Sequence, residues 1–171
     1  MKPTLQQLSI PGAILARGFW LYVWEVTTAD RAKWLYVGRT GDSSSPNAQS
    51  PFVRLSQHLA QNTKSNALRH NLENNGVDAD ACRLFKLISY GPILPEESKM
   101  DRHTPARDRM AGLEMGLWDA LSSAGYPMLN EVRSRKPLDK PLLREILAAF
   151  APKFPKLKAK RRESQAFNRL W

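Results

Sequence analysis

The sequence predicts a mixed α/β domain whose elements follow the order strand, strand, helix, helix, strand, helix. Segments 19–26 and 34–38 both contain the tetrapeptide Trp-Leu-Tyr-Val, and they are rich in the aromatic and β-branched residues that favour strands. The polar segment between them is short enough to form a hairpin loop. Beyond the hairpin, helical segments and one alternating segment supply the remaining elements.

Simple alternation places the aromatic residues of this hairpin. Successive side chains of a strand point to opposite faces, so Trp20 shares a face with Tyr22, and Trp34 shares one with Tyr36. If the strand register pairs those two faces, both tyrosine hydroxyls lie on one side of the hairpin. Taken alone, the pattern is more typical of core aromatics than of a functional site.

A helix is predicted over 51–61, after a Gly-, Ser- and Asn-rich loop at 40–50. Pro51 suits its first position, where a missing N–H does no harm. Arg54 and His58 are four residues apart, so their side chains are neighbours on one helix face. A solvated Arg–His pair is the simpler interpretation of these two residues in isolation.

The middle of the chain predicts a second helix over 65–74, with Ser65 as its N-cap. A third strand is predicted over 81–90, where apolar and polar residues alternate before Gly-Pro. The charged segment 95–105 reads as a loop, and His103 within it is expected to be exposed.

Two further helices are predicted over 107–124 and 138–150 from the spacing of their apolar residues. Glu114 lies beside the apolar stripe of the first of them. Charged residues are rarely buried without a partner or a metal, which makes Glu114 a candidate ligand. Asn130 follows in a segment that leaves this helix, and a turn residue is the alternative interpretation.

Composition predicts one domain with an appendage: a lead-in over 1–18, a body over 19–132 and an extension over 133–171. The single cysteine, Cys82, excludes an internal disulfide and a cysteine-based zinc site. No apolar run approaches the ~20 residues that span a bilayer, and the N-terminus lacks the features of a signal peptide. A reducing cytoplasmic location is therefore expected.

Positive charge is concentrated at the C-terminal end. Residues 1–132 contain 14 basic and 13 acidic side chains, whereas residues 133–171 contain 12 basic and 3 acidic ones. Such a segment is attracted to polyanions, of which nucleic acid is the commonest, and it is not clearly amphipathic enough to favour a membrane. The candidate nucleic-acid-binding residues are Arg133, Arg135, Lys136, Lys153, Lys156, Lys158, Lys160, Arg161 and Arg162.

Taken in order, these residues resemble the GIY-YIG nuclease superfamily over about 19–132. The half-motifs are Trp20-Leu21-Tyr22 and Tyr36-Val37-Gly38, with Trp20 in place of the glycine of the first. The remaining family positions are Arg54, His58, Glu114 and Asn130. The resemblance implies a three-stranded antiparallel sheet flanked by helices. Its specificity lies in the order and spacing of the whole set, because each motif alone is degenerate.

The resemblance also implies a divalent-metal-dependent endonuclease that hydrolyses phosphodiester bonds in DNA, which it favours over RNA. Glu114 would hold one Mg²⁺ or Mn²⁺ ion and Arg54 would bind a phosphate oxygen. Tyr22 would deprotonate or orient the water, with His58 as proton acceptor, because a free phenol has a pKa near ~10. Tyr36 would hydrogen-bond the phosphate or water, and Asn130 would fix the substrate or a neighbouring side chain. No small-molecule cofactor is expected.

Two alternatives remain open at this point. One is a non-catalytic nucleic-acid-binding module derived from a nuclease, in which the basic segment does the binding. The other is a basic structural protein associated with nucleic acid, in which the tyrosines and Glu114 are ordinary fold residues. The sequence leaves the target, the biological role, the oligomeric state and any specificity partner open.

Overall fold

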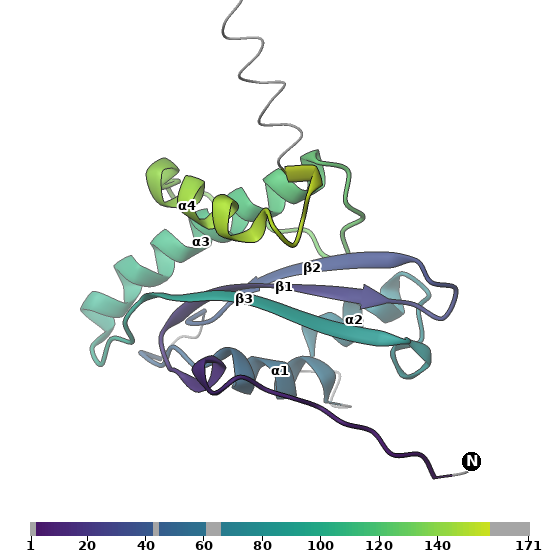
Figure 1. Cartoon of the computed structure of the whole chain (residues 1–171). Helices are drawn as coiled ribbons and strands as arrows, with labels where there is room; N and C mark the ends of the chain where they lie inside the picture. The colour runs from purple at the N-terminus through teal and green to yellow at the C-terminus, as the bar shows by residue number, and fades with distance from the viewer. Residues whose placement is uncertain (1–2, 43–44, 61–65, 158–171) are drawn as a thin grey trace, which may run out of the picture.

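The computed structural model describes residues 3–42, 45–60 and 66–157. Three antiparallel strands form one sheet in the order β2-β1-β3, with β1 at Phe19–Thr27, β2 at Lys33–Arg39 and β3 at Leu84–Leu94. Four α-helices cover its two faces, so the domain is mixed α+β with an antiparallel sheet. Helices α1 (Pro51–Leu59) and α2 (Ala67–Asn74) lie on one face, and α3 (Met100–Ser123) and α4 (Lys140–Phe150) lie on the other (Figure 1).

The register of the hairpin places both tyrosines on one face. Tyr22 is directly opposite Gly38, and Trp24 is directly opposite Tyr36. Cross-strand partners point to the same side of a sheet, so Tyr22, Trp24 and Tyr36 all face α1 and α2. They belong to a buried cluster that also contains Leu68 of α2. The register therefore meets the condition under which both tyrosines lie on one side of the hairpin.

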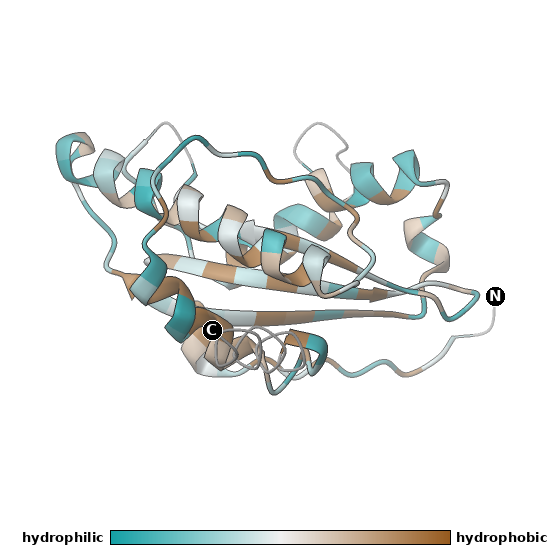
Figure 2. Ribbon diagram, turned by 90° about the horizontal axis from the view of Figure 1, so that it is seen from above, coloured by the Kyte–Doolittle hydropathy of each residue, from teal (hydrophilic) through white to brown (hydrophobic). Residues whose placement is uncertain are grey.

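The opposite face of the sheet carries the larger core. Leu21, Val23 and Val37 pack there against the apolar side of α3 (Figure 2, where apolar residues concentrate along the central strands). Ile146 and Phe150 of α4 are fully buried in the same cluster. Helix α4 lies in the segment 133–171, which the composition predicted to be an extension of the domain body. In the structure this helix is part of the core of the sheet domain.

Two glycines of α3 allow this close packing. An added Cβ on Gly112 would lie 2.4 Å from the carbonyl oxygen of Pro137, and one on Gly116 would lie 2.8 Å from the Leu143 side chain. The chain that leads into α4 therefore approaches the α3 backbone directly. A side chain at either position would push this segment away from the core.

Helix α3 begins earlier than the sequence predicts. It starts at Met100 instead of 107 and contains Pro105. His103, expected to be exposed in a loop, is completely buried, and its ring packs against Phe19 with centroids 5.2 Å apart. The expectation was wrong because the charged neighbours of His103 suggested a loop, whereas helical geometry turns this single side chain toward the sheet.

Other element ends also differ from the predicted ones. Helix α1 ends at Leu59, whereas it was predicted to reach 61. Ser65, the predicted N-cap of α2, lies outside the described residues, and the side chain of Asn66 caps α2 by accepting from the Arg69 amide at 3.0 Å. Strand β3 continues through the cis Gly91–Pro92 bond to Leu94, which an edge strand tolerates because one side of its backbone is unpaired.

The large side chain of Trp20 lies against a glycine on the neighbouring strand. A Cβ on Gly91 would lie 2.7 Å from the Trp20 indole, so the indole occupies the space that a side chain at 91 would need. Its Nε1 donates to the carbonyl of Ala16 at 3.1 Å, and its backbone amide donates to the Thr40 hydroxyl at 2.8 Å. The large side chain is thus accommodated in the local packing of the sheet.

Within the described ranges, no helix has the length and apolar content needed to cross a membrane.

Candidate active site

Tyr22 and His58 form the centre of the candidate site. The Tyr22 hydroxyl lies 2.7 Å from His58 Nε2, and both side chains are buried, with 2% and 5% exposed. Tyr22 comes from the central strand β1 and His58 from the last turn of α1. The pair therefore joins the sheet to the helix that also carries Arg54.

Aromatic rings surround His58 on the sheet side. Its ring makes edge-to-face contacts with Tyr22, Tyr36 and Trp24, at centroid distances of 5.6, 5.2 and 6.3 Å. Such packing fixes the orientation of the imidazole on its sheet side. His58 is thus a buried, oriented hydrogen-bonding group rather than the exposed residue of the simpler interpretation.

Gly38 lets the hydroxyl end of Tyr22 lie over the edge strand β2. A Cβ at this position would approach the Tyr22 ring and hydroxyl to 2.5 Å, which is closer than atoms can pack. The glycine of the second half-motif is therefore a close-approach residue. Its absence of a side chain brings the phenol to the edge of the sheet.

We expect Gly38→Ala to lower the free energy of unfolding by about 1–3 kcal/mol, because the new methyl group must displace the Tyr22 ring. Gly12→Ala is the matched control, since nothing lies within 4 Å of a Cβ there. Denaturant unfolding of both variants measures the effect. Equal stability of the two variants would show that the Tyr22 ring does not lie over Gly38.

Arg54 is held beside the phenols by two partners. Its guanidinium forms an ion pair with Asp42 and donates to Gln57 Oε1 at 3.1 Å, and 21% of its side chain is exposed. Asp42 lies in the loop after β2, three residues beyond Arg39. A partly exposed guanidinium of fixed orientation is suited to binding a phosphate oxygen.

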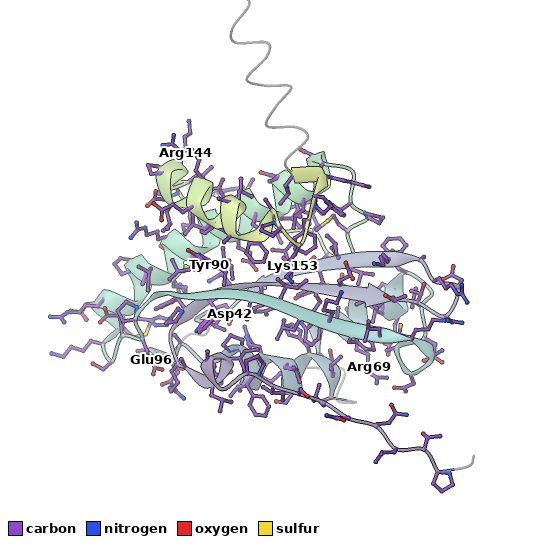
Figure 3. The ribbon with its side chains drawn as sticks, in the orientation of Figure 1. Asp42, Arg69, Tyr90, Glu96, Arg144 and Lys153 are labelled. Atoms are coloured by element: carbon purple, nitrogen blue, oxygen red, sulfur yellow. The ribbon has the colours of Figure 1, made fainter. Side chains whose placement is uncertain are left out.

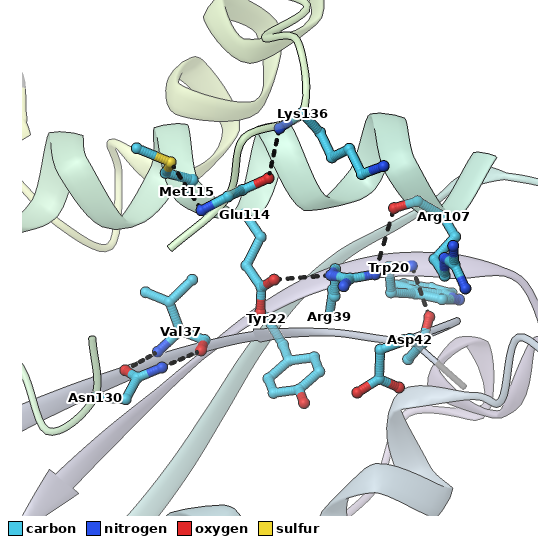
Figure 4. A network of polar contacts seen from close by, with 12 residues as sticks. Trp20, Tyr22, Val37, Arg39, Asp42, Arg107, Glu114, Met115, Asn130 and Lys136 are labelled. Atoms are coloured by element: carbon cyan, nitrogen blue, oxygen red, sulfur yellow. Dashed lines mark hydrogen bonds and ion pairs between the residues drawn. The ribbon is translucent and has the colours of Figure 1, made fainter. Parts of the chain in front are cut away.

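Glu114 reaches the same edge of the sheet from the opposite face. Its Oε2 accepts from Arg39 Nε at 2.8 Å, and both side chains are about one-sixth exposed, at 17% and 16% (Figure 4). Arg39 is the last residue of β2 and directly follows Gly38. The partner that the largely buried Glu114 requires is therefore Arg39.

The charges of these residues act on both phenols. Burial raises the pKa of Tyr22 well above its usual value, and Glu114 and Asp42 raise it further while Arg54 lowers it. Burial, Glu114 and Asp42 also raise the pKa of Tyr36, and Arg54 again lowers it. The structure thus brings Tyr22, Tyr36, Arg54, His58 and Glu114 together near the C-terminal end of β2. Asp42, in the loop that follows β2, is a further member of this group.

Glu114 keeps an incompletely compensated negative charge. Burial raises the pKa of its carboxyl, against the lowering effect of Arg39, and the nearby Asp42 raises it further. A hard divalent cation would supply the missing compensation, and one carboxylate with bound waters is a usual Mg²⁺ site. In the described residues there is no group of three or more His, Cys, Asp or Glu that could hold a metal. Glu114 and Asp42, which raises the pKa of Glu114, are the carboxylates that this edge of the sheet offers.

Burial lowers the pKa of His58 to about 4, and the nearby Arg54 contributes in the same direction. The unfolded chain takes up this proton near pH 6.5. Between pH 6.5 and 4 the unfolded state therefore binds more protons, so stability falls as the pH decreases through this window.

We expect this titration to cost about 3 kcal/mol of unfolding free energy between pH 6.5 and 4. His58→Gln should lack this part of the pH dependence, because glutamine keeps an acceptor for Tyr22 without titrating. The exposed His70→Gln is the control. The unfolding free energy, measured with denaturant across this pH range, tests the prediction. Parallel pH profiles for wild type and His58→Gln would contradict it.

Asn130 binds the backbone of β2 rather than open space. Its Nδ2 donates to the Val37 carbonyl at 2.8 Å, and its Oδ1 accepts from the Val37 amide at 3.1 Å (Figure 4). Its own carbonyl accepts from Trp118 Nε1 at 2.7 Å. The side-chain amide of Asn130 thus fixes the backbone of β2 between Tyr36 and Gly38. Asn130 therefore positions this strand.

The candidate nucleic-acid-binding residues are partly described. Arg133, Arg135, Lys136, Lys153 and Lys156 are exposed, although Arg133 is paired with Glu131 and Lys136 with Asp108. Lys153 follows the end of α4 (Figure 3). Lys158, Lys160, Arg161 and Arg162 lie outside the described residues.

Two residues of the site were missed in the sequence. Asp42 lies in a loop rich in glycine, serine and asparagine, where a carboxylate is unremarkable. Arg39 directly follows Tyr36-Val37-Gly38, and this position next to two candidate site residues could have marked it as a site residue. Its pairing with Glu114, 75 positions away, was not visible.

Comparison with known proteins gives no match for this chain among protein-family models, curated proteins or solved structures.

Proposed function

We propose that this chain is a divalent-metal-dependent endonuclease that hydrolyses phosphodiester bonds in DNA by GIY-YIG-type chemistry. The observation that carries the proposal is the buried hydrogen bond between Tyr22 and His58, with Arg54 and Glu114 close enough to shift the pKa of the same phenol. A phenol, an imidazole, a guanidinium and a carboxylate at one sheet edge are the groups that phosphoryl hydrolysis uses.

Charge stabilisation is assigned to Arg54. Phosphodiester cleavage builds negative charge on the non-bridging oxygens, and a guanidinium can donate to them in parallel. The Arg54 guanidinium must exchange Asp42 for the phosphate when substrate binds. A bound Mg²⁺ or Mn²⁺ on Glu114 would polarise the scissile phosphate and neutralise the leaving oxygen.

Proton transfer is assigned to Tyr22 and His58. The raised pKa of Tyr22 keeps its hydroxyl protonated at neutral pH. In the proposed mechanism this hydroxyl donates to the neutral His58 Nε2, which lies 2.7 Å away. As Tyr22 takes a proton from the attacking water, it passes its own proton to His58. Arg54 lowers the pKa of His58 in the free protein, so a phosphate anion on Arg54 makes His58 a better acceptor.

Cleavage of supercoiled plasmid, with added Mg²⁺ or with chelator, tests the proposal directly. Ion-dependent nicks or breaks, absent in Tyr22→Phe, support it. Binding without cleavage in every metal condition would favour the non-catalytic module. That alternative has one observation in its favour, because Glu114 and Arg54 are both already paired with side chains of this chain.

Removing residues after Leu157 is expected to weaken DNA binding and make its salt dependence shallower, by up to about 4 in the slope of log K against log salt. This truncation keeps Phe154 and α4 in the core, whereas truncation after Val132 would remove the buried Ile146 and Phe150. The segment removed contains the basic residues Lys158, Lys160, Arg161, Arg162 and Arg169.

Binding measured at several salt concentrations gives the slope. Arg144→Gln, on the exposed side of α4, is a control for loss of one positive charge (Figure 3). A slope equal to that of the full chain would show that the C-terminal segment does not contact phosphates.

A further inference from the structure

A cavity of about 200 Å³ lies directly behind His58, between α1, α2 and the edge of the sheet. Its walls are mostly apolar and include Leu68, Ala79 and Phe85, while Arg69 and Asp80 line one side. The Asp80 side chain is 67% exposed, so the cavity reaches the protein surface there. The chemistry assigned above uses only the opposite nitrogen of His58 and leaves this cavity without a role.

Unpaired side-chain nitrogens belong to two residues that line this cavity. Within the described chain, five buried side-chain nitrogens lack a partner, and three of them are His58 Nδ1, Arg69 Nε and Trp24 Nε1. His58 and Arg69 line the cavity, whereas Trp24 lies behind them, with its ring 6.3 Å from that of His58 and 6.4 Å from that of Phe85. Buried polar groups without partners are costly, so His58 and Arg69 indicate that a polar ligand belongs in the cavity.

The hydrogen bond to Tyr22 couples the proton positions on the two nitrogens of His58. When the phenol donates to Nε2, the neutral imidazole carries its proton on Nδ1, which makes Nδ1 a donor. Arg69 Nε and the Trp24 indole are donors in every state. In this tautomer of His58, all three unpaired groups require acceptor atoms.

The charge at the cavity favours a neutral ligand. Asp80 accepts from both terminal nitrogens of Arg69, at 2.7 and 3.2 Å, and so neutralises the guanidinium. A phosphate or carboxylate in the cavity would lie beside the Asp80 carboxylate. A flat, neutral group with acceptor atoms and an apolar face for Phe85 matches the lining better.

We propose that this cavity binds a nucleobase turned out of the DNA stack beside the cleaved phosphate. The assignment of the base to DNA rests on the proposed function, whereas the donors and the size of the cavity stand without it. His58 forms the wall between the cavity and Tyr22, so a base held here belongs to a nucleotide next to the phosphate at the active site. Ring nitrogens and carbonyls of bases are the acceptors that such donors bind.

Titration of the full chain with the fluorescent nucleoside 2-aminopurine deoxyriboside tests the site, without DNA or metal. Stacking on aromatic side chains quenches this probe. We expect saturable quenching with a Kd of roughly millimolar size, as suits a ligand of one base. Ala79→Leu, which fills the cavity, should weaken binding at least about 5-fold.

Ala81→Leu is the matched control, because Ala81 is exposed on the same short turn and does not line the cavity. Thermal unfolding of both variants verifies that they are folded. Equal binding by wild type and Ala79→Leu would overturn the site, and so would the absence of saturable quenching up to roughly 10 mM, which indicates a cavity filled by water alone.

This titration separates the two proposals. Nucleoside binding that Ala79→Leu removes, in a chain that never cleaves DNA, would retain the base-binding site and refute the nuclease. Metal-dependent cleavage by a chain that does not bind the nucleoside would refute the site and retain the nuclease.

Discussion

Glu114→Gln is expected to reduce metal-dependent DNA cleavage by at least about 10³-fold while DNA affinity stays within a few-fold of wild type. Glutamine can still accept from Arg39, so the contact that holds α3 to the end of β2 remains. What is lost is the negative charge, and with it the hard ligand for a divalent ion. The comparison of single-turnover cleavage rates at saturating protein isolates this step from binding.

Two further variants decide whether Glu114 is more than a structural partner. Glu145→Gln removes one negative charge from the exposed side of α4 and should leave cleavage unchanged. Arg39→Gln breaks the same ion pair from the other side but keeps the carboxylate. If Arg39→Gln and Glu114→Gln lose equal stability and equal activity, the ion pair is purely structural. If Glu114→Gln cleaves at the wild-type rate, Glu114 holds no catalytic ion.

The predicted part of the site rests on short-range rules. Alternation along each strand placed Trp20 with Tyr22 and Trp34 with Tyr36, and helical periodicity placed Arg54 beside His58. The register, which the sequence left as a condition, pairs Trp24 with Tyr36 and so brings both tyrosines to one face. These relations span a few residues or one hairpin, so the local sequence contains them.

The unpredicted part depends on contacts between distant segments. The partner of Glu114 is 75 residues away, and the burial of His103 depends on Phe19, which lies on a strand more than 80 residues earlier. The role of Asn130 depends on the carbonyl and amide of Val37, which no side-chain pattern reveals. Such contacts are set by tertiary packing, which a single sequence does not specify locally.

The packing of α4 shows the same limit. Its apolar spacing predicted a helix, and the strongly basic composition around it suggested an appendage outside the body. Gly112 and Gly116 on α3 open the space into which the chain before and within α4 packs. The two glycines inside a helical pattern could have indicated a close contact at this face of α3. Each glycine lowers helix stability, and close packing against it offsets this loss.

Arg54→Lys is expected to lower the cleavage rate by about 10²–10³-fold, although the positive charge is kept. Lysine can still pair with Asp42, so α1 and the loop after β2 keep their ion pair. An ammonium group cannot donate two parallel hydrogen bonds in the fixed plane of a guanidinium. The loss should therefore fall on the rate of the chemical step, where charge develops on two phosphate oxygens, and much less on DNA affinity.

The control for this substitution is Arg17→Lys, where the guanidinium is also bidentate but bound to Glu96. Arg17 is exposed and belongs neither to the candidate active site nor to the cavity beside His58, so its replacement should leave the single-turnover rate within a few-fold of wild type. Near-normal cleavage by Arg54→Lys would show that Arg54 acts only as a point charge. Loss of DNA binding in place of rate would instead place Arg54 in ground-state recognition, because an interaction made equally in both states changes KM and not kcat.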